Sequence, residues 1–204
     1  MPEMVALDTC EPFFEYMRKY VELDVDTMQL IADHTGAVTF PQKHTILHEG
    51  NMSDKVFFIV SGLARSYYTD FSGKTITWSF HFNSPESISK NLFAVDYRAF
   101  LKNQPSSVAI ETLAEVRALA FSKTQVSYLI DNSFIYERWM RRLNENAFMH
   151  MYDRAFTLLT MAAAERYNKL LKEEPHLLQM FSNYYIASYL GIAPQSLSRI
   201  RSQH

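Results

Sequence analysis

The hydrophobic pattern divides the chain into three zones with different periodicities. From Glu11 to His34 apolar residues recur at helical spacing, so we expect helix there, ending at Gly36. From Val38 to about Leu129 the apolar residues instead form short runs rich in β-branched and aromatic side chains, at Thr45–Leu47, Val56–Val60, Ala64–Tyr68, Thr75–Phe82, Val108–Thr112 and Arg117–Phe121. Turn residues separate these runs. Many short, regularly separated strands predict an antiparallel sandwich or barrel.

The third zone is helical and begins near Thr124. Between Ser133 and Lys172 there is no Gly or Pro, which permits one very long helix, or one with a slight break. An apolar stripe follows it through Tyr136, Met140, Leu143, Ala147 and Met151, and a second stripe lies beside it at Trp139, Phe148, Tyr152, Phe156 and Leu159. Two apolar faces need two partners, so we expect a homodimer and place the dimer contact on the first stripe. Burial of both stripes within one subunit is the alternative.

The end of the chain has the pattern of a helix-turn-helix. Gly191 stands where the chain must turn and tolerates positive φ, and the small Ala187 suits the closest approach of two crossing helices. Pro194 suits the first turn of the second helix. The polar face of that helix contains residues that can contact bases or phosphates, so we predict DNA binding through Pro194, Gln195, Ser196, Ser198, Arg199 and Arg201.

Composition and charge narrow the function further. The 204 residues have a formal net charge of −2 and a pI near 6.4, so affinity for DNA must come from a local patch. The segment 175–204 contains no Asp or Glu and meets that requirement. No 18-residue apolar run or basic leader is present, so we expect a cytoplasmic protein. Cys10 is the one cysteine, which excludes an internal disulfide or thiolate-held cluster, and we predict no cofactor and no metal.

Several motifs together resemble the cyclic-AMP receptor protein and fumarate–nitrate regulator (Crp/Fnr) superfamily. The most specific are 46–50 (ILHEG), followed by 56–62 (VFFIVSG), then 70–74 (DFSGK) and 189–192 (YLGI). The resemblance implies an α+β chain with a cyclic-nucleotide-binding-like β-roll (jelly roll) and N-terminal helices over 1–130, a long dimerisation helix over 131–172 and a helix-turn-helix over 173–204. It also implies a homodimer that binds palindromic promoter DNA and acts on RNA polymerase.

The effector cassette departs from the pattern of cyclic-nucleotide binders. Lys90 replaces the acidic residue that accepts from ribose, and Pro105 stands where the phosphate-binding arginine is expected, so we expect cyclic AMP not to be the ligand. Another effector would meet aromatic and hydroxyl side chains, and the candidate pocket comprises Trp78, Phe80, Ser89, Lys90, Phe93, Ser106 and Ser107. These residues could equally be core.

The chain stops four residues after Ile200, so we expect the contacts of a β-hairpin wing to be missing. Arg199 matches a family position that contacts guanine, and we assign it base recognition; Ser198 and Arg201 are assigned to phosphates.

Two other functions, a metalloenzyme and a binding module that does not read DNA, are alternatives to a DNA-binding regulator. A cupin-type metalloenzyme would need a His-x-His pair, but His44 and His48 are four apart, about 13 Å along a strand, too far for one metal. We therefore predict no enzyme activity. The open alternative is a dimeric ligand-sensing or protein-interaction module whose DNA-binding unit is inactive.

Overall fold

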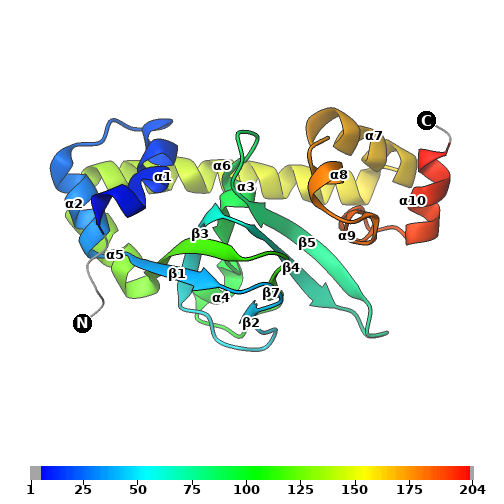
Figure 1. Ribbon diagram of the computed structural model, residues 1–204, viewed down its shortest axis with the longest axis horizontal. Helices are drawn as coiled ribbons and strands as arrows, with labels where there is room; N and C mark the ends of the chain where they lie inside the picture. The colour runs from blue at the N-terminus through cyan, green and yellow to red at the C-terminus, as the bar shows by residue number, and fades with distance from the viewer. Residues whose placement is uncertain (1–5, 203–204) are drawn as a thin grey trace.

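The computed structural model describes residues 6–202 and places two antiparallel sheets beneath a long helix (Figure 1). One sheet has the order β1-β8-β3-β6 and the other β2-β7-β4-β5. The strands are β1 (Gly36–Phe40), β2 (Thr45–Leu47), β3 (Lys55–Ser61), β4 (Leu63–Thr69), β5 (Thr75–Phe82), β6 (Phe93–Ala94), β7 (Ala109–Thr112) and β8 (Val116–Ser122). The predicted β zone is thereby confirmed, and the expected runs at 45–47 and 75–82 coincide with β2 and β5.

Helices occupy both flanks of this β-roll. They are α1 (Leu7–Arg18), α2 (Val25–Asp33), α3 (Ser89–Leu92), α4 (Tyr97–Lys102), α5 (Lys123–Asn132), α6 (Phe134–Thr160), α7 (Ala163–Glu173), α8 (Leu177–Met180), α9 (Asn183–Tyr189) and α10 (Pro194–Arg201). Side-chain caps set several of these starts: Asp24, Asp96 and Ser133 accept from backbone N–H groups of α2, α4 and α6. Among residues 6–202, no helix is both long and apolar enough to cross a membrane.

The long helix predicted over 131–172 is interrupted. Helix α5 ends at Asn132, and α6 and α7 follow as separate helices. Met161 and Ala162 have extended backbones between α6 and α7, although neither is a Gly or Pro. Glu165 stabilises the new start, because its Oε2 accepts from Ala162 N at 2.7 Å. In Figure 1 α6 runs along the molecule, with α1 and α2 at one end and α7–α10 at the other. The chain therefore turns at 161–162 and places the terminal helices beside the C-terminal end of α6.

Strand β5 belongs to two structural units at once. It is the last strand of its sheet, and its residues Phe80 and Phe82 lie in the same buried cluster as Leu177, Ile186 and Leu197 of the terminal helices. A separate cluster joins α1, α2, α5 and α6 to β3, β6 and β8. The terminal unit is consequently packed on the β-roll through β5.

Candidate nucleic-acid interface

A short turn joins α9 and α10, and this pair is called the helix-turn-helix below for its shape alone. Ser182 caps α9, and Gly191 takes a φ of +67° directly after it, a conformation that favours glycine. Ala187 and Leu197 are buried between the helices, as the pattern predicted. Pro194 occupies the first turn of α10. Each residue type singled out in the sequence thus has its expected local role.

The outer side of α10 faces away from the core. Of the predicted DNA-contacting residues, Ser196 is half-buried and the other five are exposed: Pro194, Gln195, Ser198, Arg199 and Arg201. Arg201 Nη1 donates to Asn183 Oδ1 at 2.6 Å, which ties α10 to the start of α9. Within residues 6–202, the Arg199 side chain has no hydrogen bond or ion pair, so its guanidinium is available to an external acceptor. In Figure 1 α10 lies at the end of the molecule away from the N-terminal helices.

Helix α9 is fastened to the edge of β5 by hydrogen bonds that no sequence pattern indicated. Ser188 Oγ accepts from Thr77 N at 2.8 Å and donates to Thr75 O at 3.1 Å. Nearby, the guanidinium of Arg65 lies 4.2 Å from the Tyr185 ring centroid and pairs with Glu111 at 2.6 Å. Because β5 is an edge strand, α9 supplies partners that a further strand would otherwise provide.

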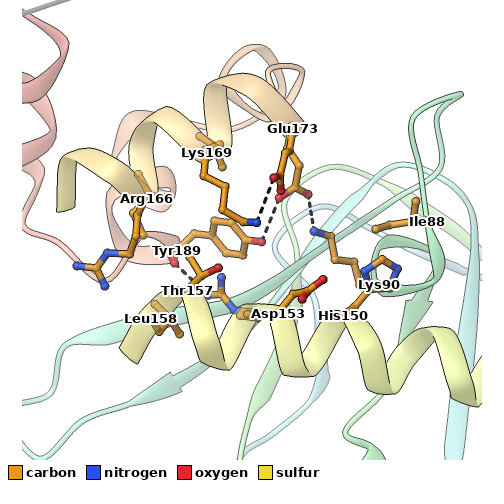
Figure 2. A pocket seen from close by; sticks show the side chains of 14 residues that line it. Ile88, Lys90, His150, Asp153, Thr157, Leu158, Arg166, Lys169, Glu173 and Tyr189 are labelled. Atoms are coloured by element: carbon orange, nitrogen blue, oxygen red, sulfur yellow. Dashed lines mark hydrogen bonds and ion pairs between the residues drawn. The ribbon is translucent and has the colours of Figure 1, made fainter. Parts of the chain in front are cut away.

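A charged pocket of about 250 Å³ lies behind this unit, between α6, α7, α3 and α9 (Figure 2). Lys90 Nζ lies 2.7 Å from Glu174 Oε1, which joins α3 to the residue after α7, and Lys169 Nζ lies 3.1 Å from Glu173 Oε1. Burial acts to lower the pKa of Lys90, but Tyr189 and Glu174 outweigh it and raise that pKa, so Lys90 is charged at neutral pH.

Arg154 forms a second connection across the same pocket. Its Nη2 donates to Tyr189 O at 3.0 Å, and its guanidinium lies 3.9 Å from the Tyr189 ring centroid and 5.5 Å from that of Trp78. Residues of α6, α3, α7 and α9 therefore surround one polar pocket, which is called the pocket of Figure 2 below.

Comparison with known proteins agrees with this architecture. Residues 37–133 match the family model described as Cyclic nucleotide-binding domain. FixK2 from Bradyrhizobium japonicum aligns over 83% of each chain with 19% identity and a TM-score of 0.67. A transcriptional regulator of the Crp/Fnr family from Eubacterium rectale aligns over 89% of this chain and 83% of its own, with 15% identity and a TM-score of 0.61.

The chain has the Crp/Fnr fold. The regulator CLP of Xanthomonas campestris, described as responsive to c-di-GMP, also shares the fold, with 14% identity over 88% of this chain and 91% of its own and a TM-score of 0.64. No curated protein sequence matches the chain.

The carboxylate of Asp96 accepts hydrogen bonds from Ser106 and Ser107, in the loop where cyclic-nucleotide binders hold the phosphate. Asp96 Oδ2 accepts from Ser107 N at 2.8 Å, from Ser106 Oγ at 2.9 Å and from Ser107 Oγ at 3.1 Å, while its Oδ1 accepts from backbone N–H groups of α4. Burial acts to raise the pKa of Asp96, but the hydrogen bonds from Ser107 and Ser106 outweigh it and lower that pKa. Asp96 was missed from the sequence, where its position before α4 is a helix-cap signal only.

The structure does not bring the predicted effector residues into one pocket, and this expectation is corrected. Phe80 stacks on Phe181 at 3.9 Å in the helix-turn-helix core, whereas Phe93 packs against Phe58 and Tyr16 in the N-terminal core. The other members are divided among different surroundings: Trp78 lies beside Arg154, Lys90 lines the pocket of Figure 2, Ser106 and Ser107 donate to Asp96, and Ser89 is buried in α3. These residues come from β5, α3, β6 and the loop before β7, which pack against different parts of the molecule.

The predicted dimer stripe is also corrected, because it faces the subunit's own core. Tyr136 and Leu143 are buried, and Met140 packs partly against the same cluster. Ala147 is half-buried and Met151 is exposed. The second stripe supplies the free apolar face instead: Phe148, Tyr152, Phe156 and Leu159 are exposed, the last by 85%. Only Trp139 of that stripe is buried.

The histidines considered for a metal site do not converge. His81 is buried and its Nε2 lies 2.6 Å from Ser66 Oγ, while His44 and His48 are exposed. In the described part of the chain, no group of three or more His, Cys, Asp or Glu residues is arranged to hold a metal ion.

Proposed function

We propose that this chain is a homodimeric transcription regulator that recognises a palindromic DNA site through α10. The observation that carries the proposal is the exposed face of α10, which presents an unpartnered Arg199 within a segment, 175–204, that has no acidic residue. A chain of net charge −2 needs such a local cationic face to approach DNA.

Individual roles follow from exposure and existing contacts. Arg199 is free to form a bidentate contact with guanine, worth about 1–3 kcal/mol of discrimination against another base. Gln195 and Ser196 lie nearer the start of α10 and are assigned to neighbouring base edges, whereas Ser198 and Arg201 are assigned to phosphates. Two copies of α10 would enter successive major grooves, about 34 Å apart.

The second copy would dock on the exposed stripe of α6. Phe148, Tyr152, Phe156 and Leu159 recur at helical spacing along one face, which is the arrangement of a two-helix seam. We expect the double substitution Phe156→Glu and Leu159→Glu to convert a dimer into a monomer, because each carboxylate at a packed apolar contact weakens association by about 2 kcal/mol or more. Sedimentation measures the mass, and Ala164→Glu, on exposed α7 surface, is the control that should leave it unchanged.

Cyclic AMP is not expected to be the effector. The Ser106 hydroxyl and the Ser107 amide already donate hydrogen bonds to Asp96, and Lys90 forms an ion pair with Glu174. A cyclic phosphate would have to displace a buried carboxylate of the same charge. Calorimetric titration should detect no heat of binding for cyclic AMP, and saturable binding would contradict this part of the proposal.

The experiment that tests DNA recognition is selection from a random duplex pool by the purified chain at about 100–150 mM salt, where non-specific binding is weakened. An enriched inverted repeat is expected. Arg199→Ala should then relax the preference at one base pair per half-site, whereas Lys172→Ala, an exposed cation at the end of α7, should leave the preference unchanged. No enrichment with or without cell extract would support the inactive-module alternative, and uniform weakening by Arg199→Ala would contradict base recognition.

A further inference from the structure

An apolar cavity of about 110 Å³ lies where α1, the β-roll, α5 and the start of α6 meet, and it is separate from the pocket of Figure 2. Its walls come from α1, α4, α5, the start of α6 and the adjoining strands, and they include Phe13, Phe93, Phe100, Val126, Trp139 and Leu143. None of its lining residues belongs to the segments around Lys90 (88–92) and Pro105 (104–108), where cyclic-nucleotide binders hold their ligand, or to the helix-turn-helix. Of the predicted effector residues it includes Phe93, and it shares no lining residue with the pocket of Figure 2.

The cavity wall contains a polar atom that has no partner in the protein. Trp139 is only 1% exposed, and its Nε1 is a buried donor with no hydrogen-bond acceptor among residues 6–202. Buried donors in folded proteins are nearly always paired. Phe13 packs on the indole in a T-shaped arrangement, at 5.1 Å between centroids and an interplanar angle of 81°, while Phe93 and Tyr136 are tilted against it. The wall of this aromatic space therefore includes a residue whose buried donor a bound molecule could satisfy.

The size and chemistry of the space restrict the ligand class. An engineered cavity of about 150 Å³ with apolar walls binds benzene, so the aromatic and aliphatic walls here favour a small apolar molecule over a charged one. Met140, which is half-buried, and Leu101, which is 63% exposed, line the outer side and can move to enlarge it. The face of an aromatic ring is a weak acceptor for an N–H donor.

We propose that this cavity binds a single-ring aromatic molecule and that Trp139 Nε1 donates to the face of that ring. Because Tyr136, Trp139 and Leu143 place the start of α6 on the cavity, an occupant would change how α6 rests on the roll. If the function proposed above holds, that change reaches the exposed dimer face on the same helix; binding itself does not depend on it.

The test uses benzene as the probe and the full-length chain. Trp78 and Trp139 are the two tryptophans, and Trp78 lies against Arg154 at the other site, so Trp78→Phe leaves one indole N–H signal in a ¹⁵N spectrum. We expect benzene to move the Trp139 signal saturably and to raise the melting temperature. Leu143→Phe fills the cavity and should abolish both effects, with Val126→Leu as a smaller filler that is easier to accommodate.

Met52→Phe is the matched control, because it adds a similar ring at an exposed position outside the cavity and should leave the benzene response unchanged. The proposal is overturned if benzene leaves the Trp139 signal unmoved, or if both filled variants respond as the parent does. An equal movement of the signal with cyclohexane would overturn the assigned N–H contact. The assay contains no DNA, so its failure is distinct from a failure of DNA recognition.

Discussion

Ser188 offers the most direct test of how the helix-turn-helix is held on the β-roll. Its hydroxyl bridges Thr77 N and Thr75 O on the edge strand β5. Thr77 is fully buried and Ser188 is 6% exposed, so water does not replace the hydroxyl while the unit stays docked. Ser188→Ala removes one oxygen and leaves both a donor and an acceptor of β5 unpaired.

The expected loss follows from those two orphaned groups. An unsatisfied buried backbone donor costs about 1–3 kcal/mol, and the small void left by the hydroxyl adds little. We therefore expect Ser188→Ala to lower the free energy of unfolding in urea by about 1–3 kcal/mol. The amide of Thr77 should also exchange its hydrogen faster, because its acceptor is gone and undocking becomes easier.

Ser198→Ala is the matched control, because Ser198 is an exposed serine on α10 whose side chain makes no contact that stabilises the fold. It should change the free energy of unfolding by less than about 0.5 kcal/mol. If Ser188→Ala were as stable as this control and Thr77 kept its protection, the hydroxyl bridge would not be a fastening point and the reasoning from edge-strand pairing would be refuted.

Two further predictions concern stability. Gly191 has a φ of +67°, so Gly191→Ala should destabilise the chain by about 1–2 kcal/mol and Gly191→Asn by less, as measured by urea unfolding; equal losses would contradict a conformational cause. Burial lowers the pKa of His81 from 6.5 to about 4, so the unfolded chain binds a proton first as the pH falls through that window. Stability should then fall by about 1.4 kcal/mol per pH unit between those values, and the slope should diminish in His81→Asn but persist in the exposed variant His48→Gln.

Local sequence patterns were sufficient to predict β5 and the turn between α9 and α10. Alternation and β-branched residues located β5 from Thr75 to Phe82, because a strand's two faces leave a period of two in the sequence. Gly191 and Pro194 marked the turn and the start of α10 through restrictions on their own backbones. Such signals depend on neighbouring residues, and a single chain contains them whether or not the rest of the fold is known.

Only the tertiary structure shows which element covers each apolar face of α6. Tyr136 and Trp139 lie on different predicted stripes of α6, yet both are buried, because the roll, α1 and α5 cover the start of that helix from more than one side. Farther along, the roll no longer covers Phe148 and Leu159, which stay exposed. Periodicity shows that a face is apolar, whereas the element that covers it depends on contacts between residues distant in sequence.

The same distinction applies to the candidate sites. The sequence alone predicted the fold class, which is confirmed, and it showed Lys90 and Pro105 at the positions where cyclic-nucleotide binders have an acidic residue and an arginine. Only the folded chain shows that Lys90 pairs with Glu174 and that Asp96 uses the donors at Ser106. These partners come from elements brought together by packing, and a residue's chemistry does not specify which distant group will satisfy it.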